Sequence, residues 1–277
     1  MDPYALQLTV DEALEACRVA SGLSRHGHGA GALALYARVL DDCEVVLARV
    51  PAEEDALAHA AEDLLAHALD AALQAAADVG AAAQQLARDG KAAAAVKQYA
   101  AVLGACAHAQ RSHVVLAAES YDLTERLHAQ ALYGALRALP DVCELAEAAA
   151  RAHGFSSALK LGALVVDVCE RVRGGLPAND PMHAEAEQLH ARALEGSLTH
   201  AIAAFSEVGG RADAAKPASC APAGASLPRE TLSEILRACK RVLVSHGVGT
   251  AALRESAQQL YRPALLDFRQ ALNAAGA

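Results

Sequence analysis

Residues 27–43 read GHGAGALALYARVLDDC, and residues 90–106 read GKAAAAVKQYAAVLGAC. The two stretches carry the same side-chain types at the same offsets, and each residue lies 63 positions from its counterpart. Tyrosine and cysteine, both part of the match, are rare in this chain, with 6 and 7 among 277 residues. Rare residues at a constant spacing indicate an internal repeat rather than shared composition. The matched pairs are Gly27 and Gly90, Ala32 and Ala95, Leu33 and Val96, Tyr36 and Tyr99, Val39 and Val102, Leu40 and Leu103, and Cys43 and Cys106.

A third copy follows after a further 63 residues, although the glycine is displaced to Gly154 and Gly162 replaces the tyrosine. A second landmark, downstream of the first, places leucine and alanine at spacings of four and five, which is one stripe of a helix. The third copy retains Ala158, Leu159, Val165, Val166 and Cys169. The second landmark consists of Leu64, Ala68, Leu69 and Leu73, then Leu127, Ala131, Leu132 and Leu136, and, at an interval of 62, Leu189, Ala193, Leu194 and Leu198.

Each repeat is predicted to contain three helices. The first helix ends in a glycine that can adopt the left-handed C-cap conformation, at Gly27, Gly90 and Gly154. The second carries the alanine, tyrosine, valine-leucine and cysteine stripe, and the third follows a loop. The predicted fold class is therefore all-α, an α-solenoid-like array of antiparallel helical hairpins or three-helix bundles. We expect repeats at 8–76, 77–139 and 140–207, a flexible linker at 208–228 and a truncated capping repeat at 229–275.

Two registers are open for the capping repeat. Ser245-His246-Gly247 followed by Ala252-Leu253 repeats the spacing from His26-Gly27 to Ala32-Leu33, and this register is preferred. The alternative register places Cys239 in the cysteine column.

Composition supports the helical prediction and limits the classes of partner. Apolar residues make up 54% of the chain but aromatic residues only 3%, so the excess is mostly alanine and leucine, which favour helices. The net charge of −9 opposes binding to nucleic acid or to anionic lipid. The longest uncharged stretches, such as 98–110, are shorter than the roughly 20 residues that span a bilayer. We expect a cytoplasmic protein, because the first residues lack a secretory signal and no CxxC pair is present.

The glycine-x4-alanine-leucine-x2-tyrosine-x2-valine-leucine pattern of residues 27–40, copied at 90–103, resembles the helical hairpin of tetratricopeptide (TPR) repeats. It is also similar to the microtubule-interacting-and-trafficking (MIT) domain, which adds a third helix. A TPR unit has about 34 residues, so the 63-residue period fits the MIT-like description better. The proline that ends the second TPR helix is absent here. The resemblance implies that grooves between helices bind short peptide segments. Its matched positions are packing residues, so the protein-binding residues stay unknown.

The residues that could carry chemistry fit structural roles better. Tyr36 and Tyr99 are expected to fill the gap where two helices cross at alanines, with the hydroxyl near water or a partner. The column of Cys43, Cys106 and Cys169 suits a small buried hydrophobic residue, because no histidine recurs beside all three as an activating base. The other cysteines are Cys17, Cys143, Cys220 and Cys239, of which Cys220, in the predicted linker, is expected to be the most exposed.

The histidines, the glycine-rich loop and the acidic runs give no metal or cofactor site. His26 and His28 could hold a surface ion, but no acidic or thiol group completes a tetrahedral set. His128 and His190 are predicted to occupy equivalent helix positions, in packing or at a solvated edge. The loop 27–31 lacks the lysine and preceding strand of a phosphate-binding loop. Glu53, Glu54 and Asp55 suit a helix N-terminus. We therefore predict no catalytic, cofactor-binding or metal-binding residues and no cofactor.

The leading hypothesis for function is a non-catalytic scaffold or adaptor that binds helical or extended peptide segments in grooves between helices. The acidic balance favours partners that are basic amphipathic helices or tails. One alternative is a structural subunit of a larger cytoskeletal or membrane-trafficking assembly, in which alanine-rich faces allow self-association. An enzyme is the third and weakest alternative, because the inward columns hold Ala, Leu, Val, Tyr and Cys rather than clustered titratable groups.

Overall fold

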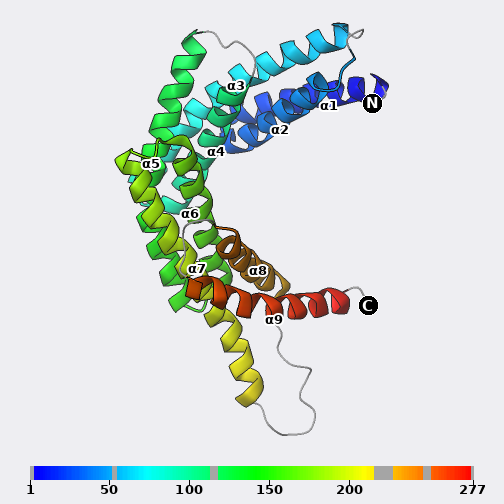
Figure 1. The fold of residues 1–277 in the computed structure, drawn as a ribbon. Helices are drawn as coiled ribbons and strands as arrows, with labels where there is room; N and C mark the ends of the chain where they lie inside the picture. Colours follow the sequence, from blue (N-terminus) through cyan, green and yellow to red (C-terminus); the bar gives the residue numbers. More distant parts are fainter. Residues whose placement is uncertain (1–2, 52–54, 113–117, 215–226, 246–250, 276–277) are drawn as a thin grey trace. The chain divides into compact units, whose positions relative to one another are not determined.

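The computed structural model describes residues 3–51, 55–112, 118–214, 227–245 and 251–275. All regular secondary structure in these ranges is α-helical, as Figure 1 shows, so the predicted fold class is confirmed. The helices are α1 (Pro3–Arg25), α2 (Gly29–Leu47), α3 (Asp55–Arg88), α4 (Ala92–Arg111), α5 (Ala118–Arg151), α6 (Phe155–Gly175), α7 (Pro181–Ala214), α8 (Arg229–Val244) and α9 (Ala251–Ala275).

The chain divides into two compact units, residues 1–138 and 139–277, and the division falls inside α5. In the first unit, α1, α2, α3 and α4 pack on one another in chain order, and α2 also contacts α4. In the second unit, α6 packs on α7 and α8 packs on α9, while α8 also contacts both α6 and α7. Within each unit, successive helices are antiparallel neighbours, which is the tandem helical-repeat packing expected from the sequence.

The 63-residue interval is present in the helix boundaries themselves. Helices α2, α4 and α6 begin at Gly29, Ala92 and Phe155, each 63 residues after the last. Helices α3, α5 and α7 are each 34 residues long and keep the same interval at both ends. Three repeats of the same helical pair therefore follow one another, and the repeat period predicted from side chains is also the period of the backbone.

The predicted third helix of one repeat and first helix of the next form one continuous helix. The expected limits at 76/77 and 139/140 consequently fall inside α3 and α5. Only Gly80 interrupts the alanine-rich middle of α3, at a cost of about 1 kcal/mol. Pro140 lies inside α5 and removes one backbone hydrogen bond, but the neighbouring Leu139 and Val142 are fully buried. This burial offsets the cost of the proline, so the helix continues.

The turns before α2, α4 and α6 are built alike. Gly27 and Gly90 have positive φ angles of 77° and 72°, as predicted for left-handed C-caps. In the third turn the left-handed residue is His153, with φ 59°, whereas Gly154 has φ −83° and precedes α6. The prediction for Gly154 was therefore wrong, because the backbone keeps the 63-residue interval although the glycine has moved. Equivalent hydrogen bonds close all three turns: His28 N–H to Leu23 O (2.9 Å), Lys91 N–H to Leu86 O (2.9 Å) and Gly154 N–H to Ala149 O (2.8 Å).

The segment predicted as a linker is partly helical. Helix α7 continues through Gly209 and Gly210 to Ala214, because good helix formers surround the glycines. Residues 215–226 lie outside the described ranges.

The packing of α8 favours the alternative register of the last repeat. Helix α8 contacts α6 as α4 contacts α2, and Cys239 is fully buried in it. Ile235 and Val242 have the same offsets from Cys239 as Val165 and Val172 have from Cys169, and all are fully buried. Gly247, on which the preferred register depended, lies outside the described residues. The alignment of α8 with the earlier repeats therefore rests on the cysteine column, because the buried stripe determines how the helix packs.

Candidate functional site

The two tyrosines of the repeat lie in the core. Tyr36 on α2 and Tyr99 on α4 are 2% and 3% exposed. The hydroxyl of Tyr36 forms a 3.0 Å hydrogen bond with Ser21 Oγ on α1 rather than reaching water or a partner. The ring of Tyr99 packs against Gly134 on α5, where a Cβ atom would overlap the end of the ring. Both residues are positioned for packing.

The repeated cysteines share one environment. Cys43, Cys106 and Cys169 lie on α2, α4 and α6, and each is fully buried with a free thiol. Burial raises the pKa of each thiol to about 12, which keeps it protonated and unreactive at neutral pH. Cys17, Cys143 and Cys239 are buried as well, and Cys220 lies outside the described residues.

Of the histidines singled out in the sequence, His26 and His28 share one exposed turn, whereas His128 and His190 lie on α5 and α7. His26 Nδ1 bonds to the carbonyl of Gly22 at 2.7 Å, and His28 precedes α2 on the exposed turn. In the described ranges, no three histidine, cysteine or acidic side chains converge as metal ligands. No described helix has an apolar run long enough to cross a membrane.

His190 lies in the core of the third repeat and is 2% exposed. The buried positions of α7 follow those of α5 at an interval of 62, since Ala193, Leu194 and Leu198 are buried as Ala131, Leu132 and Leu136 are. His190 therefore occupies the position of His128, as predicted, and that of Leu65 in the first repeat. Burial lowers the pKa of His190, against the opposing effect of Glu170, whose Oε1 lies 3.4 Å from Nε2. A histidine therefore stands where the first repeat buries Leu65.

The glycine-rich loop has a structural function. Gly27 supplies the left-handed turn, and Gly29 allows the start of α2 to approach α3. A Cβ atom on Gly29 would lie 2.5 Å from Val79 Cγ2. Asp55 begins α3, as expected of an acidic residue at a helix N-terminus, whereas Glu53 and Glu54 lie outside the described residues.

A groove in the first unit has the geometry of a binding site. It lies where the end of α2, the first half of α3 and the end of α4 meet, and its volume is about 760 Å³. Its apolar part consists of Leu47 at the end of α2, the following Ala48, and Leu65 and Ala66 from α3. Leu65 is 3% exposed and forms part of the core, whereas Ala48 and Ala66 are exposed. The groove thus has an apolar floor continuous with the core.

Acidic side chains line the rim of this groove. Glu44 on α2 and Glu62 and Asp63 on α3 are exposed, and Arg111 on α4 is the only cation among the groove residues. The guanidinium of Arg111 donates through Nε to the carbonyl of Ala107 at 3.1 Å. Three carboxylates against one guanidinium leave an excess of negative charge beside the apolar floor. We call this site the acidic groove.

No family model matches the sequence, and no curated protein matches it. A solved structure described as a circular tandem repeat protein with novel repeat topology and enhanced subunit contact surfaces is similar at a TM-score of 0.31 and 15% sequence identity. The match covers 95% of this chain and 52% of that chain, so the protein spans about half the length of that structure.

Sequence reasoning missed the acidic groove because its rim repeats only in part. Glu62 has a counterpart in Glu125, but the positions 63 residues after Glu44 and Asp63 are Ala107 and Arg126, so the three carboxylates occur together only in the first repeat. A search for conserved columns finds the core and passes over such residues. The sequence signal for such a site is a polar or charged residue near a helix end that differs from its counterparts in the other repeats.

Proposed function

We propose that this protein is a non-catalytic scaffold that binds a basic amphipathic segment of a partner protein in the acidic groove. The observation that carries the proposal is the combination of an apolar floor and an acidic rim at the junction of three helices. A volume of about 760 Å³ is in the range of sites that enclose several side chains. The resemblance to TPR and MIT hairpins, whose grooves bind peptide segments, supports the same function.

The partner's chemistry follows from the groove. Leu47, Leu65 and the two alanines accept apolar side chains, which a helix presents at i, i+3 or i+4, and i+7. Glu44, Glu62 and Asp63 then face lysine or arginine side chains beside those anchors. Burial of the anchors supplies most of the affinity, while the exposed charges mainly raise the association rate and select the partner. Binding is therefore expected to weaken as salt increases.

Two features support a binding function over a catalytic one. The rim carboxylates are exposed, so they lack the desolvation that prepares an acid or base for catalysis. The cysteine thiols that repeat along the chain are held protonated by burial.

The test uses the full chain and a synthetic helical peptide with leucine at i, i+3, i+7 and lysine at the flanking positions. Fluorescence anisotropy should show saturable binding that weakens between 50 and 200 mM salt. Combined Glu44→Gln, Glu62→Gln and Asp63→Asn should weaken binding at least tenfold at low salt. Combined Asp11→Asn, Glu12→Gln and Glu15→Gln removes equal charge from exposed positions of α1 and should leave the affinity nearly unchanged.

A second variant tests the floor without changing charge. Ala66→Tyr fills the groove from an exposed position and should abolish binding, whereas Ala81→Tyr, exposed on the other half of α3, should not. The proposal fails if the peptide does not bind saturably. It also fails if Ala66→Tyr binds as well as the unaltered chain, because the peptide would then be held by the general acidic surface.

A further inference from the structure

A second concavity lies in the second unit, among α6, α7 and α8, with a volume of about 430 Å³. Its walls carry four cations, Arg173 from α6 and Arg237, Lys240 and Arg241 from α8. Glu170 is its only carboxylate, and His190 from α7 completes the polar lining. Such a concentration of positive charge is notable in a chain whose net charge is −9. We call this site the cationic cavity.

The repeat builds the cationic cavity and the acidic groove from equivalent positions. Glu170 and Arg173 lie at twice the 63-residue interval from Glu44 and Leu47, which line the acidic groove. His190, which lies 125 residues (63 plus 62) after Leu65, replaces a buried leucine that also lines the acidic groove. The third repeat therefore keeps the concavity and replaces two leucines with a guanidinium and an imidazole. Packing alone does not explain these replacements, because the leucines already filled the same positions in the first repeat.

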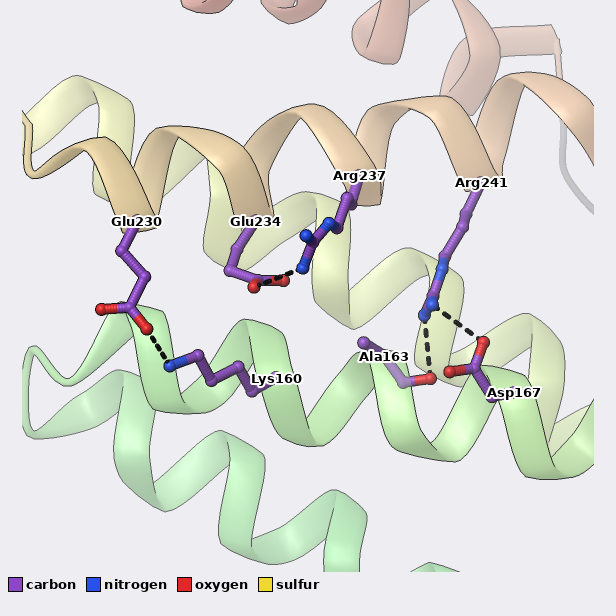
Figure 2. Close-up of polar contacts among 7 residues, drawn as sticks. All are labelled: Lys160, Ala163, Asp167, Glu230, Glu234, Arg237 and Arg241. Atoms are coloured by element: carbon purple, nitrogen blue, oxygen red, sulfur yellow. Dashed lines mark hydrogen bonds and ion pairs between the residues drawn. The ribbon is translucent and has the colours of Figure 1, made fainter. Parts of the chain in front are cut away.

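Two of the cations are held in place by the protein itself, as Figure 2 shows. Arg241 donates to the carbonyl of Ala163 and to Asp167 on α6, each at 2.8 Å. Arg237 pairs with Glu234 at 2.9 Å, and Lys160 pairs with Glu230 near the start of α8. The contacts of Arg241 and Glu230 fix α8 against α6, whereas the Arg237–Glu234 pair lies within α8 and orients the Arg237 side chain.

The remaining cations keep unused hydrogen-bonding capacity. Within the described residues, Arg173 and Lys240 have no ion-pair partner. Arg173 Nε and His190 Nδ1 are both buried without a hydrogen-bond partner, and His190 is only 2% exposed. A buried polar atom without a partner costs roughly 1–3 kcal/mol. Two such atoms at one cavity indicate a site whose polar groups are satisfied by a ligand.

We propose that the cationic cavity binds a phosphomonoester carried by a partner polypeptide, that is, a phosphorylated side chain. A phosphomonoester carries close to two negative charges at neutral pH and three acceptor oxygens, which match the guanidinium of Arg173 and the ammonium of Lys240 better than a carboxylate does. Because His190 Nε2 faces the acceptor Glu170, His190 Nδ1 donates to a phosphate oxygen when the bound dianion holds the imidazole in its protonated form. The cavity is large enough for the phosphoryl group and the side chain that carries it. Arginine clusters are a recurring means of phosphopeptide recognition.

The experiment is a calorimetric titration of the full chain with the pentapeptide Gly-Ala-phosphoserine-Ala-Gly and with its serine form. The phosphorylated peptide should bind saturably, and the serine peptide should not. Arg173→Gln and Lys240→Gln should each weaken binding about tenfold, the value of one charge-assisted hydrogen bond. Lys97→Gln, at an exposed position of the first unit, should have no effect.

Arg173→Gln and a further substitution, His190→Leu, are designed to preserve the fold. Arg173→Gln introduces the residue found 63 positions earlier, at Gln110, and His190→Leu introduces the leucine found at Leu65 in the first repeat. His190→Leu should leave the protein at least as stable as before while weakening the phosphopeptide. Retained stability together with weaker phosphopeptide binding would show that His190 acts in binding rather than in packing.

Free phosphoserine and sulfate distinguish the source of the phosphoryl group. Weaker binding of free phosphoserine than of the pentapeptide supports a phosphorylated polypeptide, whereas equal binding overturns that assignment. Equal affinity for sulfate, or binding insensitive to Arg173→Gln and Lys240→Gln, would show general anion attraction and overturn the site altogether. The acidic-groove variants lie in the other unit and use a different peptide, so either proposal can fail without the other.

Discussion

Bulky and small side chains compensate for one another across neighbouring helices. Tyr99 faces Gly134, and Gly162, which takes the place of the tyrosine in the next repeat, faces Ser197. The burial pattern of α7 makes Gly196 the counterpart of Gly134, so this glycine is retained. Ser197, the next residue, lies where a side chain at position 162 would extend. The absence of the tyrosine from the third repeat is therefore a change of packing between α6 and α7.

This pairing predicts the effect of enlarging a glycine. Gly134→Ala should destabilise the first unit by about 1–3 kcal/mol, because the new methyl group overlaps the buried ring of Tyr99. Gly80→Ala, inside α3 with nothing within 4 Å of the added Cβ, should instead stabilise by about 0.5–1 kcal/mol through helix propensity. Urea unfolding measures both. Equal effects from the two substitutions would show that Gly134 is not needed for close packing.

The left-handed position at His153 makes a second residue-scale prediction. A residue with a Cβ atom pays roughly 1–2 kcal/mol there, so His153→Gly should stabilise the second unit by about 0.5–1 kcal/mol. Gly90→Ala should destabilise the first unit by about 1 kcal/mol, because a residue with a Cβ atom disfavours the positive φ of this position. The added Cβ would meet no neighbouring atom, so the whole effect comes from the backbone. His153→Ala also removes the contact between His153 Nδ1 and Glu207 (3.3 Å) but keeps a Cβ atom, so the difference between the glycine and alanine variants in urea unfolding isolates the backbone effect. Destabilisation by His153→Gly would contradict this account.

At the scale of elements, the sequence predicted which faces are buried but not where helices end. The alanine, valine and cysteine columns could be read from the spacing, because burial acts on each side chain in turn. The joining of α3 across Gly80 and of α5 across Pro140 could not, because the cost of a breaker is local whereas the packing that offsets it comes from other helices. The two proposed binding surfaces could not be predicted from the repeat pattern for a related reason. Residues such as Asp63 and Arg173 matter because they depart from the repeat.

The attachment of α8 to α6 gives an element-scale prediction. Arg241→Met removes the bonds from this side chain to the Ala163 carbonyl and to Asp167. Because the side chains of Arg241 and Asp167 are partly exposed, removing these bonds should lower the free energy of opening α8 by about 1 kcal/mol, which corresponds to roughly fivefold faster amide exchange in α8. Hydrogen exchange with mass spectrometry measures it helix by helix. Lys240→Met removes the same charge from α8 without breaking such bonds and should not accelerate exchange, and an equal response from both variants would rule out a specific role for Arg241.

At the scale of the whole molecule, α5 is the element that both compact units share. In repeat proteins each element contacts mainly its neighbours along the chain, so stability is a sum of local terms rather than one global value. Leu69 in α3 and Leu198 in α7 are both buried, one in each unit. Replacing either with alanine should cost about 2–5 kcal/mol.

The two losses should remain separate. Leu69→Ala should accelerate hydrogen exchange in α1 to α4 and in the part of α5 before residue 139, and Leu198→Ala should accelerate it in α6 to α9 and in the rest of α5. The unaltered protein under the same conditions supplies the reference rates. If either substitution accelerated exchange equally in both units, the chain would unfold as one cooperative body, and α5 would transmit the loss of packing completely. A graded response along α5 is the result expected when a continuous helix is stabilised at each end by a different set of neighbours.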